Sequence, residues 1–150
     1  SLTLQVDSRR GKVVYRDTKE KGSKERGEFP WVPNLIPKEF LFHWMRTLAF
    51  DQVPAGECLL LVSPTRRFRM TAQLSAREEV KTPAGTFSCY RVDLQPDLGP
   101  LRLLPIKSLV PKMTLWCKAD SPHLWVRYAG PVGGPGSPAA VIELTSWKAS

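Results

Sequence analysis

The residues best suited to chemistry in this sequence are two histidines and three cysteines. The cysteines Cys58, Cys89 and Cys117 are far apart, and none belongs to a C-x-x-C pair, so a small zinc module is not expected. Cys117 and His123 could in principle form a pair that activates a thiolate. Cys89 and Cys117 could form one disulfide if their strands are neighbours, and buried free thiols are the alternative.

Motifs for catalysis and for cofactor binding are absent. The sequence has no H-E-x-x-H, no P-loop, no dinucleotide fingerprint and no G-x-S-x-G elbow. Residues 130–135 are rich in glycine, but they lack a lysine and a following helical pattern, which indicates a loop. We therefore expect no catalytic residues, no metal and no cofactor, and we predict that the protein is not an enzyme.

Large apolar side chains suggest a binding site instead. The chain has five tryptophans, a residue type that fills cores or lines apolar ligand grooves. Core packing is the plainer interpretation, and a groove between a helix and a sheet is the functional one. The residues that would line this groove are Phe40, Trp44, Met45, Tyr90, Trp116 and Trp125.

Basic residues concentrate near the start of the chain, which carries a formal charge of +8. Such a cluster attracts nucleic acid or anionic lipid headgroups, and a solvated hairpin is the alternative. The candidates for contact with an anionic surface are Arg9, Arg10, Lys12 and Arg16. Only Tyr15 adds an aromatic ring to this cluster, which disfavours nucleic acid.

The elements that would position these residues are mostly strands. Alternating apolar and polar residues predict a hairpin from residues 2–8 and 12–16, and the charged residues 17–29 predict a mobile basic loop. One helix is predicted over residues 37–50, with Asn34 as its N-cap and Pro37 in its first turn.

The rest of the chain shows a strand pattern. Pro83 and Gly85 predict a tight turn in a hairpin whose second strand runs over residues 86–95. Residues 96–111 contain several prolines and leucines and predict a long apolar loop across the sheet. The other predicted strands are 57–63, 66–73, 74–81, 112–119, 124–129 and 139–147.

These elements predict a mainly β fold of the α+β class, in which a curved antiparallel sheet, a half-barrel, wraps around one helix. The length of 150 residues fits a single domain, 1–150, or the C-terminal part of a larger half-barrel. No apolar run approaches the roughly 20 residues that a membrane-spanning helix needs.

The order of motifs resembles a bacterial domain family of unknown function that is associated with the cell envelope. The motifs that carry the resemblance are the hairpin VKTPAGTFSCYRV over residues 80–92, Trp116, and the dipeptide Arg127–Tyr128. This family is similar to the half-barrel superfamily of the periplasmic lipoprotein carrier. The resemblance implies a periplasmic or membrane-associated location, reached after removal of a signal peptide, and binding of an acyl chain.

Three functions follow as hypotheses. The first is a non-enzymatic envelope protein that binds a hydrophobic or lipid-like ligand between helix and sheet. The second is a structural or protein-interaction module of the cell envelope, which docks an envelope partner through a sheet edge or through the basic hairpin. The third is binding of nucleic acid or of an anionic membrane surface by the basic N-terminal hairpin.

Overall fold

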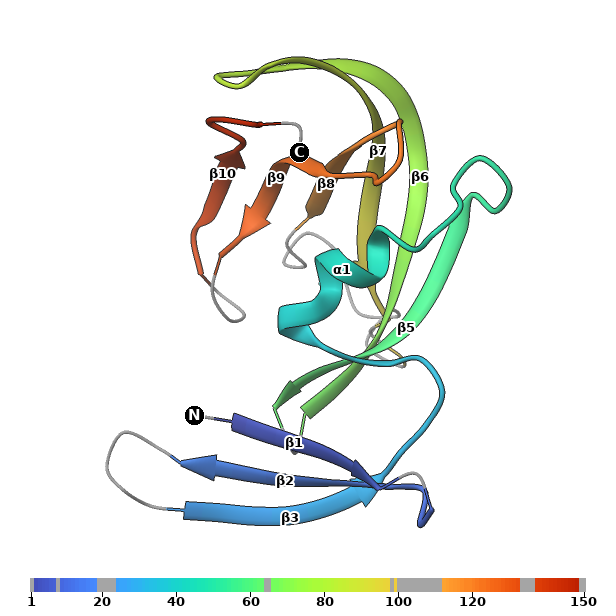
Figure 1. The fold of residues 1–150 in the computed structure, drawn as a ribbon, viewed down its shortest axis with the longest axis vertical. Coiled ribbons are helices and arrows are strands. Elements are labelled where there is room, and N and C mark those ends of the chain that lie inside the picture. The colour runs from blue at the N-terminus through green and yellow to red at the C-terminus, as the bar shows by residue number, and fades with distance from the viewer. Residues whose placement is uncertain are drawn as a thin grey trace.

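A computed structural model describes residues 2–7, 9–18, 24–63, 66–97, 99, 112–132 and 137–148 of the chain. Its strands form one sheet of three strands and one of seven, which confirms the mainly β fold class (Figure 1). In chain order the elements are β1 (Leu2–Asp7), β2 (Lys12–Thr18), β3 (Lys24–Pro30), β4 (Leu35–Pro37), the 3₁₀ turn η1 (Lys38–Phe40), α1 (Leu41–Met45), β5 (Ala55–Ser63), β6 (Arg66–Thr82), β7 (Gly85–Pro96), β8 (Met113–Lys118), β9 (Trp125–Pro131) and β10 (Ala139–Glu143).

The seven-stranded sheet is a curved meander with one strand added at its edge. Its order is β10-β9-β8-β7-β6-β5-β4, and neighbours from β5 to β10 are antiparallel. The three residues of β4 pair in parallel with β5, so the sheet is mixed and not purely antiparallel. Strand β4 was not predicted, because three residues that include a proline carry no strand pattern.

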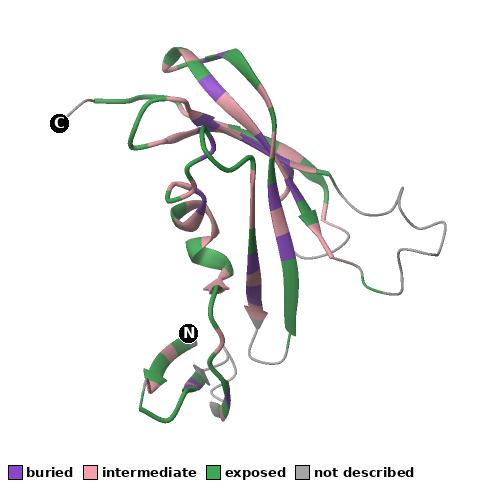
Figure 2. Cartoon of the chain, turned by 90° about the vertical axis from the view of Figure 1, so that its right-hand side faces the viewer, coloured by how far each residue is buried: buried purple, intermediate pink, exposed green. Residues whose placement is uncertain are grey.

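The helix lies in the concave side of this sheet, as predicted, but it is shorter than predicted (Figures 1 and 2). Met45 of α1 is fully buried in the main core with residues of β5 to β9. Beyond Met45 the backbone continues with i→i+3 hydrogen bonds, such as Leu48 N–H to the Met45 carbonyl at 3.2 Å, instead of helical ones. Asn34 is not an N-cap, since it has a φ of 64° and its carbonyl accepts a hydrogen bond from Leu59.

The three-stranded sheet, ordered β1-β2-β3, lies at one end of the molecule (Figure 1). It contains the predicted hairpin of β1 and β2. The predicted loop 17–29 is wrong at residues 17–18, which end β2, and at residues 24–29, which belong to β3 and pair with β2. Residues 19–23 lie outside the described part. Alternation explains the strand, because Phe29 is buried in the small core while Arg26 and Glu28 are exposed.

Strand β6 replaces two predicted strands with one of 17 residues. No turn residues separate the two halves, and a bulge at Ser75 changes the register with β7 between Leu74 and Ala76. At the far end, the turn from Thr82 to Gly85 forms as predicted. The Thr82 hydroxyl donates to the Gly85 carbonyl at 3.2 Å, and Gly85 has a φ of 131°, which favours glycine.

The predicted long loop 96–111 begins inside β7, which ends at Pro96, and residues 98 and 100–111 lie outside the described part. Strand β10 ends at Glu143, earlier than predicted. Among the described helical segments, none has the length and apolar character required to span a bilayer.

Candidate ligand-binding site

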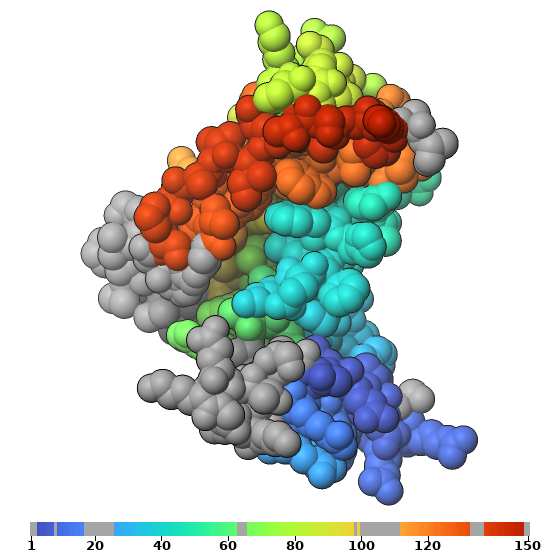
Figure 3. All heavy atoms as spheres, turned by 60° about the vertical axis from the view of Figure 1, so that its left-hand side comes forward, coloured from blue at the N-terminus to red at the C-terminus, as the bar shows by residue number. Residues whose placement is uncertain are grey.

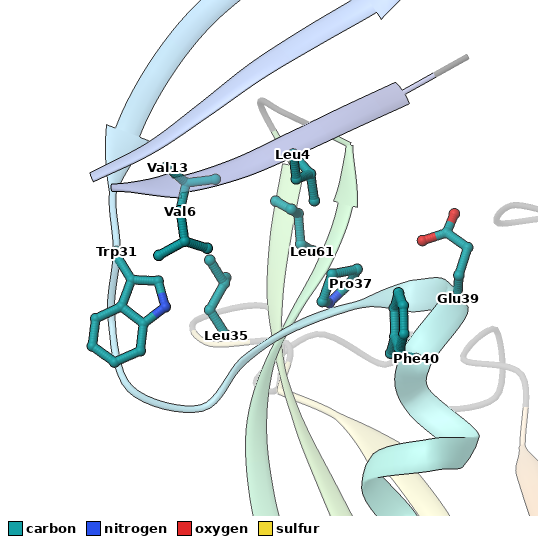
Figure 4. Close-up of a pocket in the computed structure, with 9 residues that line it drawn as sticks. All are labelled: Leu4, Val6, Val13, Trp31, Leu35, Pro37, Glu39, Phe40 and Leu61. Carbon is teal, nitrogen blue, oxygen red and sulfur yellow. The ribbon is translucent and has the colours of Figure 1, made fainter. Parts of the chain in front are cut away.

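An apolar groove of about 520 Å³ lies between the small sheet and the entry to α1 (Figure 4). One wall comes from the inner face of the small sheet, and the other from β4, η1 and the end of β5. Trp31 lies at one end of the row of side chains, and Phe40 and Glu39 lie at the other. The lining residues are Leu4, Val6, Val13, Trp31, Leu35, Pro37, Glu39, Phe40 and Leu61.

Local structure explains why these side chains meet. Leu4 and Val6 share one face of β1 because side chains alternate along a strand, and Val13 joins them through the pairing of Val6 with Val13. The parallel pair β4–β5 brings Leu35 and Pro37 to the end of β5, where Leu61 is buried in the small core.

The floor and the rim of the groove differ in exposure. Val13 and Leu61 form a floor that is 2% exposed. At the rim, Val6 is 54% exposed, Trp31 45% and Phe40 56%. Exposed large apolar residues gathered around one groove are typical of a binding surface, whereas single exposed residues need no explanation.

Glu39 is the one titratable residue among those that line the groove. Its side chain is 58% exposed, and its Oε1 lies 3.8 Å from Nζ of Lys38, so this ion pair is weak and screened by solvent. The groove is therefore apolar along its length and negatively charged at one end. None of its other lining residues could act as an acid–base partner of Glu39.

Of the six residues predicted to line a groove between α1 and the sheet, four meet in the main core, namely Trp44, Met45, Tyr90 and Trp125, whereas Phe40 and Trp116 lie elsewhere. Only Phe40 reaches the observed groove. Met45 and the half-buried Trp44 belong to the main core, and Trp125 lies against Phe42 with ring centroids 5.7 Å apart. These side chains pack into the space beneath α1.

Tyr90 and Trp116 lie on opposite faces of the seven-stranded sheet. The Tyr90 ring packs near Phe50 and His123, with centroids 6.1 Å and 6.0 Å away. Trp116 points away from α1 and belongs to the cluster of Val80, Cys89 and Val126. Trp116 therefore cannot form a wall of a groove beneath α1. The prediction failed for this residue because the alternation along β8 does not indicate which of its two faces meets the helix.

The predicted basic residues are placed by the β1–β2 hairpin. Arg9 and Arg10 lie in its turn, and their backbone N–H groups each donate to Asp7 Oδ1 at 3.1 Å. Lys12 donates to Glu28 Oε1 at 2.6 Å, while Arg16 is paired in register with Arg26 of β3. The small sheet thus gathers the predicted cluster on one exposed surface and adds Arg26 to it.

The cysteines are free thiols in the core. Cys117 belongs to the main core, whereas Cys89 belongs to the cluster on the other face of the sheet, so the disulfide considered above is not formed. Burial raises the pKa of Cys58 and of Cys89 to about 11 and that of Cys117 to about 12.

The thiol–imidazole pair is not formed either. Nδ1 of His123 lies 3.0 Å from the Lys118 carbonyl oxygen, and its ring faces Tyr90. A Cys117 thiol that stays protonated at neutral pH is a poor nucleophile. Within the described ranges, no group of three His, Cys, Asp or Glu side chains is arranged to hold a metal ion.

Sequence reasoning missed most of the groove. The alternation of Leu4, Val6 and Val13 was visible as an apolar face, but nothing in the sequence showed what would cover it. Trp31 was counted among the tryptophans without a position, and Leu35 belongs to the strand that was missed.

Comparison with known proteins adds no relative: no family model, no curated protein and no solved structure matches the chain. The resemblance to an envelope family and the location it implies remain predictions.

Proposed function

We propose that this protein binds an elongated apolar ligand, such as an acyl chain, in the groove between the small sheet and α1. The observation that carries the proposal is the gathering of Val6, Trp31 and Phe40, all large, apolar and exposed, around one hollow with a buried apolar floor. The predicted lipid-like ligand is retained, but the site that we propose for it lies beside the small sheet and not beneath α1.

The size of the groove suits such a ligand. Its volume of about 520 Å³ lies within the range of roughly 300–1,000 Å³ found for small-molecule sites. Burial of apolar surface would contribute about 25 cal/mol per Å², opposed by the loss of ligand freedom. Exposed rim residues would then become buried against the ligand.

The chemistry of the ligand's head follows from Glu39. A carboxylate at one end of an apolar groove disfavours a free fatty acid, whose own carboxylate would be repelled. A neutral or cationic head is favoured. With one titratable group in its lining, the groove supports binding and not a reaction.

The first test is binding of N-phenyl-1-naphthylamine, an uncharged fluorescent probe. The double variant Val6→Asn/Phe40→Ser removes two rim residues and should weaken probe binding at least tenfold. The matched control is Val141→Asn/Phe68→Ser, which changes the same residue types at exposed positions outside the groove lining.

Equal loss of affinity in the two double variants would refute the groove as the site, and so would absence of probe binding to the unchanged protein. Native mass spectrometry of protein purified without detergent adds an independent readout, because a bound acyl compound from the host would show directly as added mass. An envelope location and an envelope protein partner remain separate predictions, tested by cell fractionation and by cross-linking in cells.

A further inference from the structure

The outer face of the small sheet, opposite to the groove, carries a cluster of arginines. Alternation places Gln5 of β1, Val14 and Arg16 of β2 and Arg26 of β3 on this face, because Val13, Tyr15 and Phe29 occupy the buried one. A polar hollow of about 320 Å³ lies among these residues. It is lined by Gln5, Val6, Asp7, Arg9, Val14, Arg16 and Arg26.

The described acidic residues of this face already have cationic partners. Asp7 accepts two backbone hydrogen bonds and lies 3.8 Å from Nε of Arg10. Glu28 accepts a hydrogen bond from Lys12, which lowers the pKa of Glu28. Both carboxylates are therefore partly neutralised from within the sheet.

Three guanidinium groups form no such close pair, although the charge of Arg26 also helps to lower the pKa of Glu28. Within the described residues, the side chains of Arg9, Arg16 and Arg26 take part in no hydrogen bond or ion pair, although all three line one hollow. Like charges that line one hollow repel one another, and an anion placed between them would relieve the repulsion. Guanidinium groups bind phosphate oxygens with two parallel hydrogen bonds, which makes phosphate the best match.

The neighbourhood of the hollow indicates the source of the phosphate. The backbone N–H of Trp31 donates to the Gly11 carbonyl at 2.8 Å, which fixes the exposed Trp31 beside the turn that carries Arg9 and Arg10. Val6, also exposed, lines both the hollow and the groove from the edge strand β1. Arginine beside exposed tryptophan and valine matches a bilayer surface, where charge and apolar contact act together.

We propose that the β1 edge of the small sheet docks on an anionic lipid surface, with Arg9, Arg16 and Arg26 binding headgroup phosphates and Trp31 entering the interfacial region. This surface lies at one end of the molecule, where the β1–β2 hairpin projects from the remainder of the chain (Figure 3). It shares Val6 and Trp31 with the rim of the apolar groove and differs from the groove in its arginines.

The test measures co-sedimentation of the full chain with phosphatidylcholine vesicles, with and without phosphatidylglycerol. Binding is expected only to the anionic vesicles and should decrease with added salt. The triple variant Arg9→Gln/Arg16→Gln/Arg26→Gln should bind about 100-fold more weakly, at roughly fivefold for each arginine. The control Arg66→Gln/Lys112→Gln/Lys148→Gln removes the same charge from exposed positions elsewhere and should keep the affinity.

Further measurements separate the sources of phosphate. Trp31→Ser should weaken vesicle binding several-fold, and Trp147→Ser, at an equally exposed tryptophan, should not. Equal loss in the two triple variants would overturn the proposal, since only net charge would then matter. The proposal would also be overturned if calorimetry detected binding of inorganic phosphate while no binding to vesicles was found. It would likewise be overturned if the chain bound a DNA oligonucleotide more tightly than the anionic vesicles and this binding depended on the same arginines. Circular dichroism and urea unfolding confirm that each variant is folded.

Discussion

Trp116 has more polar contacts than any side chain in the groove. Its ring lies between the guanidinium carbons of Arg91 and Arg127, 5.9 Å and 5.6 Å from the ring centroid. Its Nε1 donates to Glu78 Oε1 at 2.6 Å, which links β8 to β6 across β7. This residue was predicted to bind a ligand, and its contacts instead link four neighbouring strands, β6 to β9.

Replacement of Trp116 by Phe tests whether Trp116 stabilises the sheet. The ring stays, the hydrogen bond to Glu78 is lost, and the free energy of unfolding should fall by about 1 kcal/mol. Urea unfolding measures it. Trp147→Phe is the control at a more exposed ring and should change stability by less than about 0.5 kcal/mol. Equal values for the two variants would contradict the structural assignment.

Glu39 should set the preference of the groove for the head of its ligand. Decylamine, which is cationic at neutral pH, should bind roughly two- to fivefold more tightly than decanol, because an exposed ion pair contributes no more than about 1 kcal/mol. Glu39→Gln should remove this preference and leave decanol binding unchanged. Glu57→Gln, at an exposed site on β5, serves as the control. Titration calorimetry gives the ratio, and an unchanged ratio in Glu39→Gln would exclude this role.

Among the elements, β3 has a glycine at a position where a side chain would require the neighbouring Tyr15 ring to move. A Cβ atom built on Gly27 would lie 2.7 Å from the ring of Tyr15, its register partner on β2. Tyr15 in turn packs with Phe29 in the small core, and Arg67 of β6 lies 5.1 Å above the Phe29 ring. The absence of a side chain at Gly27 thus leaves room for the Tyr15 ring in the small core, which Leu61 of β5 also joins.

Gly27→Ala should therefore displace the Tyr15 ring and lower the free energy of unfolding by roughly 1–3 kcal/mol. The same substitution in a Tyr15→Val background should cost much less, because the clash is gone. Urea unfolding of the four proteins completes a double-mutant cycle. Additive effects in that cycle would show that the two residues do not meet.

The elements also show how far a sequence can predict this fold. Strands with clear alternation and a strong turn, such as β7 after the Thr82–Gly85 turn, were predicted within a residue or two. The charged strand β3 was missed because net polarity was given more weight than alternation. The three residues of β4 could not be predicted as a strand from the sequence, because their pairing with β5 depends on a contact that forms only in the folded chain.

For the molecule as a whole, the site was harder to predict than the fold. Aromatic residues such as Trp44 and Trp125 are good candidates for a groove and equally good core residues, and composition cannot separate the two roles. The groove arises where the small sheet meets β4 and β5, so its walls come from segments whose proximity no local pattern records.

Global stability should depend on pH through the buried thiols. The folded chain holds the protons of Cys58 and Cys89 up to about pH 11, whereas an unfolded thiol releases its proton near pH 8.5. Stability should therefore be fully present below about pH 8.5 and decline above it, by up to roughly 1.4 kcal/mol per pH unit for each thiol.

Cys117, with a pKa of about 12, allows this contribution to be isolated. Urea unfolding of the unchanged protein and of Cys117→Ala, from pH 7 to pH 10 in steps, compares chains that differ by one thiol. The Ala variant should be less stable at pH 7 but lose stability less steeply above about pH 8.5. Parallel curves would show that the Cys117 thiol titrates alike in both states.

Strand β6 changes its role halfway along its length. From Met70 to Gln73 it is paired on both sides, whereas from Ala76 to Thr82 its described register partners all come from β7. That second half is a border at which another copy could attach by strand pairing, and its charged residues oppose this. They are Arg77, Glu78, Glu79 and Lys81. The Lys81 carbonyl, moreover, already accepts a hydrogen bond from Arg127 at 2.7 Å. Neutral residues at these places would therefore be expected to favour self-association in concentrated solution.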